Sequence, residues 1–325
     1  MNLKSTHSCG TDNIDSYILK LACQELLPVI THIINISIKQ KLFPSPWKTA
    51  KVIPLHKKDE RTEPKNYRPV ALLAITSKIL ERAIFNQLIE YLETNDLLHP
   101  SHHGFRKNHS TASALLQMNH SWIEALEDKE ITAVIMLDMS AAFDLVDSSL
   151  LIQKLKYYGL QDCATSWLTS YLTDRQQCVY VDGTFSKYLP VEVGVLQGSI
   201  LGPLLYILFS NDLPEAIHDH LPEHDQGFFN IHCHSCGGMC CFADDSTYSA
   251  SSQNPGELKI KIDEKYKEIS RYMASNRLVL NGDKTHLLVM ASERQHLVNG
   301  NFGISLDTGD EVILPVDCEK LLGAL

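Results

Sequence analysis

The sequence has no apolar run long enough to cross a bilayer, and stretches such as 204–209 fall far short of the roughly 20 residues that a spanning helix needs. Its N-terminal segment lacks the charged, apolar and cleavage regions of a secretory signal. Cysteines number nine, an odd count at irregular spacing, which favours a reducing compartment over a disulfide framework. These absences argue against membrane and disulfide-stapled proteins and predict an intracellular protein with no membrane partner.

Basic residues are also outnumbered by acidic ones. The sequence has 29 Lys and Arg and 39 Asp and Glu, which gives a net charge of −10. Such a balance argues mildly against nucleic-acid binding, since phosphate contacts are made by Lys and Arg. The cations are nevertheless concentrated in 39–68, while acids gather at 124–130 and 218–225. A basic segment beside an acidic one suits a metal-dependent enzyme that acts on phosphates. A solvated charged loop is the alternative interpretation.

Strand and helix patterns follow one another in mixed order, which predicts an α+β protein. An apolar share of 44% over 325 residues allows a large core in one domain or two. The longest helical pattern, 14–41, contains Pro28, so we expect a kink or break there. Thr76 or Ser77 is expected to cap another helix. Helices are predicted at 76–92, 111–126, 148–158, 163–172, 204–211 and 255–276, and strands at 50–55, 131–137, 178–181 and 185–189.

Carboxylates at the ends of apolar strands are the most informative feature of the chain. Asp244 and Asp245 follow the apolar run 239–243 and precede 246–248, which predicts a strand, a turn carrying paired acids and a second strand. Asp138 closes a similar run at 133–137. One Asp after a strand is commonly a turn former or a helix cap. Here one strand is followed by a single acid and another by two adjacent acids. This pattern instead favours a site for two Mg²⁺ ions roughly 4 Å apart, as in nucleotidyl transfer.

The segment 136–144, followed by Phe242-Ala243-Asp244-Asp245, resembles reverse transcriptases of non-LTR (LINE-type) retrotransposons. One such box would be weak support, and it is the shared order of several blocks, from about Asp12 onward, that carries the resemblance. The other blocks are Trp47-Lys48 through Lys57-Lys58, Asn66-Tyr67-Arg68-Pro69-Val70, Lys78-Ile79-Leu80-Glu81, Gly104-Phe105-Arg106 with His109-Ser110-Thr111, Gly194 through Pro203, Asn281 through Thr285, and Leu321-Leu322-Gly323.

The resemblance implies a right-hand polymerase with fingers and an RRM-like palm sheet, its thumb largely absent. Residues 1–11 stay unassigned, 12–130 would form an N-terminal extension and the fingers, and 131–325 the palm with interleaved fingers segments, truncated before the thumb. The implied activity is RNA-directed DNA polymerisation, and the implied partners are an RNA template, a DNA primer and deoxynucleoside triphosphates. Such a protein would reside in a retrotransposon ribonucleoprotein, nuclear or cytoplasmic. Oligomeric state is not indicated by the sequence.

The implied catalytic residues surround two Mg²⁺ ions, with Mn²⁺ as a possible substitute. Asp138 and Asp244 would each bridge both ions, and Asp245 would be less directly engaged. The backbone carbonyl of Met139 is a further ligand by the same resemblance. Lys284 matches a position proposed to protonate the pyrophosphate, although a lone Lys on a turn is otherwise a solvated surface residue.

The remaining implied roles concern the nucleotide and the template. Arg68 and Lys78 resemble cations that hold the triphosphate, and Phe143 the ring that blocks a ribose 2′-hydroxyl. Without the surrounding motifs, an ordinary core aromatic would be the better interpretation of Phe143. The flexible turn of Gln197 and Gly198 would contact the nucleotide or template. The residues expected to contact the template are Gly104, Phe105 and Arg106.

The stretch 232–241 departs from the family pattern. Cys233 and Cys236, followed by two glycines, resemble half of a zinc knuckle that nearby His or Cys could complete. Cys240 and Cys241 fall on the strand leading into the acids, where a small apolar role is expected. No second knuckle is present in the sequence, so we favour an ordered insertion over a structural zinc site.

Two other functions are compatible with the acids. An RNA-dependent RNA polymerase would use the same metal chemistry, but Phe143 disfavours it. A catalytically inactive or domesticated nucleic-acid-binding remnant, lacking thumb and endonuclease, belongs to a different class. Retention of Asp138, Asp244 and Asp245 speaks against loss of metal binding, and no endonuclease block is visible in the sequence.

Overall fold

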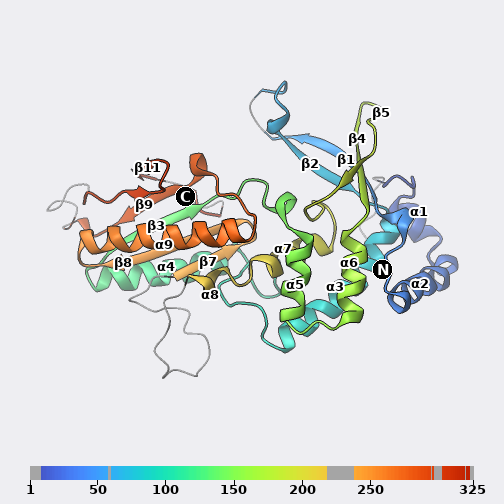
Figure 1. The fold of residues 1–325 in the computed structure, drawn as a ribbon, viewed down its shortest axis with the longest axis horizontal. Coiled ribbons are helices and arrows are strands. Elements are labelled where there is room, and N and C mark those ends of the chain that lie inside the picture. Colours follow the sequence, from blue (N-terminus) through green and yellow to red (C-terminus); the bar gives the residue numbers. More distant parts are fainter. Residues whose placement is uncertain are drawn as a thin grey trace. The chain divides into compact units, whose positions relative to one another are not determined.

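The structure is a computed structural model that describes residues 9–57, 60–217, 238–293, 295, 302–318 and 320–322. The chain forms two compact units, each built from two separate stretches (Figure 1). Unit 1 comprises Met1–Leu97 and Phe143–Phe209, and unit 2 comprises Leu98–Ala142 and Ser210–Leu325. Segments far apart in the sequence are therefore neighbours within each unit.

Unit 1 contains a twisted sheet whose strand order is β2-β1-β4-β5, with β6 paired to β4. Strand β1 pairs antiparallel with β2 and parallel with β4. The tight turn between β4 and β5 is Asp182-Gly183, and both residues have the positive φ that is typical of a two-residue hairpin loop. The strands are β1 (Thr49–His56), β2 (Tyr67–Leu72), β4 (Arg175–Val181), β5 (Thr184–Phe185) and β6 (Leu189–Val191).

The helices of unit 1 bury large apolar side chains, including Leu80 and Leu92 of α3 and Tyr206 and Phe209 of α7. Trp167 and Tyr171 of α6 stack on each other at 5.7 Å between ring centroids. The helices are α1 (Ser16–Leu21), α2 (Cys23–Gln40), α3 (Ile75–Thr94), α5 (Ser148–Tyr157), α6 (Asp162–Leu172) and α7 (Leu201–Ser210), with short 3₁₀ turns η1 (Ser45–Trp47), η2 (Pro64–Asn66) and η3 (Ala142–Leu145).

Two expectations about helix ends in unit 1 are wrong. The break in the first helical segment falls at Ala22, and Pro28 lies inside α2. Pro28 has no N–H to donate to the Gln24 carbonyl. Both residues are exposed, so water can hydrate this carbonyl, which lowers the penalty of the missing hydrogen bond. Helix α3 begins at Ile75 after Ala74 without a side-chain cap, and Ser77 instead bonds to Glu81 inside the helix.

Unit 2 is organised around a five-stranded sheet of order β12-β9-β3-β8-β7. Its centre is β3 (Ile131–Leu137), whose continuous apolar run is buried and pairs antiparallel with β8 and β9. The other strands are β7 (Gly238–Phe242), β8 (Asp245–Ser252), β9 (His286–Met290) and β12 (Pro315–Val316), beside a separate pair of β10 (Leu306–Asp307) and β11 (Val312–Ile313).

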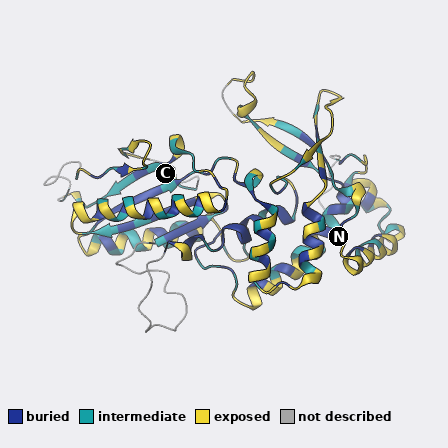
Figure 2. Cartoon of the chain, viewed as in Figure 1, coloured by how far each residue is buried: buried dark blue, intermediate teal, exposed yellow. Residues whose placement is uncertain are grey.

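Two capped helices pack on this sheet. Helix α4 (Thr111–Glu127) starts with a capping box at Ser110 and buries Ala114 and Met118 against Cys240 of β7. Helix α9 (Pro255–Ser275) is capped by Asn254 and buries an apolar stripe, confirming the predicted amphipathic helix. Its outer side is exposed while the strands behind it are buried or half-buried (Figure 2). Short segments α8 (Leu213–Ala216) and η4 (Gly282–Lys284) complete the unit.

In the described part of the chain, no helix combines the length and the apolar character that crossing a bilayer requires.

Candidate active site

Asp138 lies where the central strand of unit 2 ends. Strand β3 pairs with β8 so that Leu137 is opposite Ser246, and the next step of this antiparallel register sets Asp138 beside Asp245. The strand is buried except at the half-buried Met136, and about a third of the Asp138 side chain (34%) is exposed beyond its end. The expected meeting of acids from two strands therefore follows from strand register.

Asp244 and Asp245 belong to the hairpin that joins β7 to β8. Phe242 is paired with Asp245, so Ala243 and Asp244 form a two-residue loop. Ala243 has a φ of +58°, a value that most residues adopt only in tight turns. The side chains of both acids reach solvent at this hairpin.

The Asp245 carboxylate is close enough to those of Asp244 and Asp138 to be repelled by both. The pKa of Asp245 is raised above its ordinary value, first by partial burial and then by the negative charges of Asp244 and Asp138. A cation bound among these groups would offset the repulsion on Asp245.

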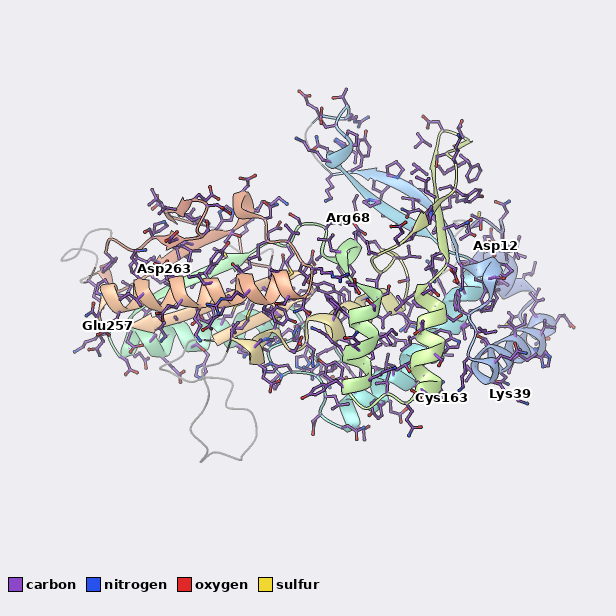
Figure 3. The ribbon with its side chains drawn as sticks, in the orientation of Figure 1. Asp12, Lys39, Arg68, Cys163, Glu257 and Asp263 are labelled. Atoms are coloured by element: carbon purple, nitrogen blue, oxygen red, sulfur yellow. The ribbon has the colours of Figure 1, made fainter. Side chains whose placement is uncertain are left out.

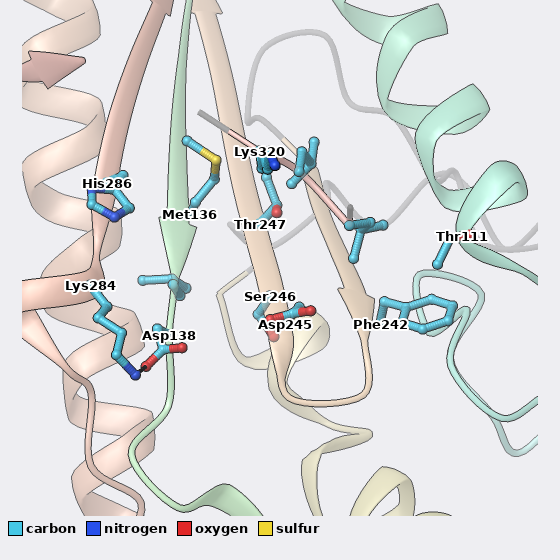
Figure 4. A pocket seen from close by; sticks show the side chains of 13 residues that line it. Thr111, Met136, Asp138, Phe242, Asp245, Ser246, Thr247, Lys284, His286 and Lys320 are labelled. Carbon is cyan, nitrogen blue, oxygen red and sulfur yellow. Dashed lines mark hydrogen bonds and ion pairs between the residues drawn. The ribbon is translucent and has the colours of Figure 1, made fainter. Parts of the chain in front are cut away.

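Lys284 and Asn281 both bond to the Asp138 carboxylate, and Figure 4 shows the contact with Lys284. The Asp138 carboxylate accepts hydrogen bonds from Lys284 Nζ at 3.2 Å and Asn281 Nδ2 at 3.3 Å. The backbone N–H of Asn281 donates to the Asp138 carbonyl at 2.9 Å, and Met139 forms a bridge with Leu280. The turn at 281–284 is thus attached to the end of β3.

A cavity of about 370 Å³ opens beside these groups, within unit 2 (Figure 4). Asp138, Asp245 and Lys284 line it together with Phe242 and Thr247, whereas Asp244 is outside the lining. Cross-strand partners share one face of a sheet, and the pairs Phe242–Asp245 and Thr247–Met136 place these four lining residues on the same face.

The donor atoms suit a hard divalent cation, because carboxylate and carbonyl oxygens are the ligands that Mg²⁺ prefers. Within the described ranges, no three His, Cys, Asp or Glu side chains are already arranged around a common metal position. Asp138 is instead engaged with Lys284, an exposed side chain at 62%. Since such an exposed ion pair is worth about 1 kcal/mol or less, a divalent ion can displace the lysine.

A loop of unit 2 supports the acid-bearing hairpin from its outer edge. The N–H of Cys241 donates to the Ser101 carbonyl and the N–H of His103 to the Cys241 carbonyl, both at 2.8 Å. Gly104 is buried against the turn, and a Cβ added there would lie 2.5 Å from the backbone nitrogen of Ala243. Sequence reasoning missed this supporting role, because only the approach of two distant backbones reveals it.

The neighbours of Gly104 were expected to contact a template. Phe105 is 52% exposed and has a φ of +54°, so its ring is available to a ligand. The Arg106 guanidinium donates to the carbonyls of His99 at 3.0 Å and His102 at 3.1 Å, which secures the supporting loop. Template contact by these three residues stays a prediction.

The same loop contains a buried histidine with a pH-dependent consequence. His102 is 1% exposed, and its Nε2 lies 3.2 Å from the Ser210 carbonyl. Burial, followed by the charge of His99, lowers the pKa of His102 from 6.5 to about 3. The folded protein therefore keeps this ring neutral where the unfolded chain protonates it.

We expect the free energy of unfolding to fall as the pH drops from 6.5 toward about 3, by up to roughly 5 kcal/mol from this one group, because only the unfolded state takes up the proton. His102→Gln, which keeps a donor for the Ser210 carbonyl, should show a shallower slope. Urea unfolding at several pH values measures the free energy of unfolding of the wild type and of His102→Gln. Parallel curves for the two proteins would refute this assignment.

The nucleotide-binding candidates all lie in unit 1. The Phe143 ring in η3 stacks on Tyr206 of α7 with centroids 4.7 Å apart, and it is half-buried. Its carbonyl accepts the N–H of Val195 at 2.8 Å. The stack on Tyr206 orients the ring, and the hydrogen bond from Val195 holds the backbone that carries it.

Gln197 and Gly198 form a loop that presses against β2. The N–H of Ala71 donates to the Gln197 carbonyl at 2.8 Å. Gly198 has a φ of +116°, and a Cβ there would lie 2.5 Å from the Ala71 carbonyl oxygen, so only glycine fits without a shift. The Gln197 side-chain amide donates to the Asp144 carboxylate at 3.5 Å.

The two expected phosphate-binding cations are also in unit 1. Arg68 is exposed on β2 opposite Leu55 (Figure 3), and Lys78 is half-buried in the first turn of α3. The structure thus groups the candidates by unit, with the acids and Lys284 in unit 2 and Arg68, Lys78, Phe143, Gln197 and Gly198 in unit 1.

Two pairs of cysteines precede the acids in the sequence. Cys233 and Cys236, the zinc candidates, lie outside the described residues. Burial raises the pKa of both Cys240 and Cys241 to about 12, so each is a neutral thiol at neutral pH. Cys240 packs with Ala114 and Met118 as a small apolar residue, which confirms the expectation for this strand.

Comparison with known proteins gives relatives of one kind. The chain is 36% identical over 214 residues to the probable RNA-directed DNA polymerase from transposon BS of Drosophila melanogaster, covering 64% of this chain and 23% of that protein. It is 34% identical to the RNA-directed DNA polymerase from mobile element jockey of the same fly, covering 63% and 22%. The chain thus spans about a quarter of the length of these relatives.

A solved structure shares the fold. The apo telomerase from Candida tropicalis, truncated from its C-terminal domain, matches with a TM-score of 0.54 at 13% identity, over 77% of this chain and 52% of that one. The expected α+β fold of a right-hand polymerase is thereby confirmed. The family model for reverse transcriptase (RNA-dependent DNA polymerase) matches residues 55–306. The chain belongs to the reverse transcriptase family.

Proposed function

We propose that this chain is the fingers and palm portion of the RNA-directed DNA polymerase of a non-LTR retrotransposon, which adds deoxynucleotides to a primer 3′-hydroxyl. The register that sets Asp138 beside Asp245, with Asp244 on the adjoining turn, is what supports this activity most directly. In this proposal unit 2 acts as the palm and unit 1 as the fingers. The template is RNA, the primer is DNA, and the protein acts within a ribonucleoprotein in the nucleus or cytoplasm.

Reverse transcriptases generally use divalent metal ions and work on a nucleic-acid template and primer. In this chain Asp138, Asp244, Asp245 and the Met139 carbonyl would hold two Mg²⁺ ions, with Mn²⁺ as a substitute. Such ions, when bound, lower the pKa of the primer hydroxyl and neutralise the charge of the pyrophosphate. Lys284 would exchange its contact with Asp138 for the pyrophosphate and give it a proton.

Selection of the nucleotide falls to unit 1. Phe143, supported by its stack on Tyr206, offers a 2′-hydroxyl neither space nor a hydrogen-bond partner, so a ribonucleotide would lose the hydration of that group. The exposed Arg68 guanidinium suits bidentate contact with a phosphate, and Lys78 adds a second charge. Gln197 and Gly198 would border the base or the template strand.

Primer extension on an RNA template tests this function. With deoxynucleotides and Mg²⁺ we expect the wild type to elongate a DNA primer. Elongation should be at least about tenfold lower with ribonucleotides. The Asp244→Ala variant should not elongate the primer. A preference for ribonucleotides would instead favour an RNA-dependent RNA polymerase. Binding of primer and template without elongation under any metal condition would favour a non-catalytic remnant.

A further inference from the structure

A carboxylate with no exposed surface belongs to unit 1, whereas Asp138, Asp244 and Asp245 belong to unit 2. Glu81 of α3 is 0% exposed. A buried carboxylate is strongly unfavourable unless several donors compensate for the lost water, so its partners indicate what it holds in place.

Those partners converge from three helices of unit 1. One carboxylate oxygen of Glu81 accepts the N–H of Ile200 at 2.7 Å and the N–H of Leu201 at 3.3 Å. The same oxygen accepts the Tyr171 hydroxyl at 3.3 Å, and the other accepts the Ser77 hydroxyl at 3.4 Å. Leu201 is the first residue of α7, so the carboxylate satisfies N–H groups that a helix start leaves without partners.

The anchored amides directly follow the Gln197–Gly198 loop. On its other side, this loop is bonded to Ala71 of β2 through the Gln197 carbonyl. Ser199 closes the turn, since its hydroxyl donates to the Leu196 carbonyl at 2.8 Å and accepts the Gly202 N–H at 2.9 Å. The loop is therefore clamped between β2 and the buried carboxylate.

We propose that Glu81 is a positioning residue for nucleotide binding: by holding the Ile200 and Leu201 amides, it fixes Gln197 and Gly198 for the incoming deoxynucleoside triphosphate. This inference rests on the proposed function. Burial raises the pKa of Glu81, whereas the Ile200 and Leu201 amides, Arg175 and Lys78 lower it. Hydrogen-bond geometry, rather than net charge, is accordingly what the loop requires.

This distinction makes the variants informative. In Glu81→Gln the amide oxygen can accept from Ile200 and Leu201, while its NH₂ group can donate to the Ser77 hydroxyl, so the loop stays anchored. In Glu81→Ala both amides lose their acceptor. Leu92→Ala is the matched control, because Leu92 is also 0% exposed on α3. Among the described residues, no hydrogen bond joins Leu92 to the loop or to Glu81.

Two measurements on the same proteins test the proposal. Hydrogen exchange reports the Ile200 and Leu201 amides, and a fluorescent deoxynucleoside triphosphate with Mg²⁺ reports the dissociation constant. For Glu81→Ala we expect faster exchange and at least about tenfold weaker nucleotide binding, because the Ile200 and Leu201 amides lose their acceptor and no longer fix the loop. Glu81→Gln should bind within about threefold of the wild type. Leu92→Ala should melt at a lower temperature with unchanged affinity.

The outcomes separate this inference from the proposed function. If Glu81→Ala exchanges faster but binds nucleotide as tightly as the wild type, the positioning role is overturned and the polymerase proposal stands. A wild-type chain that binds no nucleotide overturns both. If Glu81→Ala fails to fold, Glu81→Asp replaces it, since the shorter acid withdraws from the amides while keeping its charge. Wild-type affinity in Glu81→Asp, together with faster exchange, would equally overturn the role.

Discussion

Asp138→Asn is expected to lower the rate of primer extension by roughly 10³-fold or more, equivalent to about 4 kcal/mol of transition-state stabilisation. The substitution keeps the size and shape of the side chain and removes its negative charge. An uncharged amide is a poor ligand for Mg²⁺, so the proposed metal pair would lose the one carboxylate that comes from β3.

The fold should survive this change. The ion pair between Asp138 and Lys284 joins side chains that are 34% and 62% exposed, and such pairs contribute about 1 kcal/mol or less. The carboxamide oxygen can still accept from Asn281. Removing the charge also takes away one repulsion that raises the pKa of Asp245, so stability at neutral pH should be equal or slightly higher.

Single-turnover extension and thermal unfolding, each over a range of Mg²⁺ concentrations, check both halves of the prediction. Asp128→Asn serves as the matched control, because it removes the same charge from an exposed position at the end of α4 in unit 2. The control should extend primers normally. An Asp138→Asn protein that polymerises at the wild-type rate would discredit the metal assignment.

Local sequence patterns were sufficient for the elements that carry the acids. The apolar run 133–137 predicts a buried strand at 131–137 because both of its faces must be buried, and β3 has these bounds. Paired acids between the apolar run 239–243 and the short segment 246–248 predict the β7–β8 hairpin, since a turn must separate strands that pair. The stripe from Leu258 to Met273 likewise predicts α9.

Features that depend on distant partners were not accessible from these patterns. Pro28 interrupts a helix in any local description, yet its exposure lets α2 continue through it. Glu81 lies in a recognisable block, 78–81, but nothing around it indicates that its carboxylate is buried under Ile200. The attachment of Asn281 to Asp138 joins residues 143 positions apart, and only the pairing of β3 with β9 brings them together.

Gly104→Ala is expected to reduce primer extension by about 10²-fold, although residue 104 carries no reactive group. The added Cβ would lie 2.5 Å from the Ala243 nitrogen and 3.2 Å from the Phe242 carbonyl carbon. Both are backbone atoms of the hairpin that presents Asp244, so the turn itself must move. A displacement of about 1 Å at a catalytic group suffices for a loss of this size.

The same crowding should lower the free energy of unfolding by about 1–3 kcal/mol, as overpacking does elsewhere. Gly104 does not have a positive φ, so the backbone conformation of alanine adds no strain and the contact with Ala243 is the cause. Gly256→Ala is the matched control, because its Cβ would meet only the Asn254 side chain at 3.3 Å in the first turn of α9. Extension measured at equal concentrations of folded protein should be normal in this control. Normal extension in Gly104→Ala would mean that the hairpin tolerates displacement, and the supporting loop would then have no role in presenting the acids.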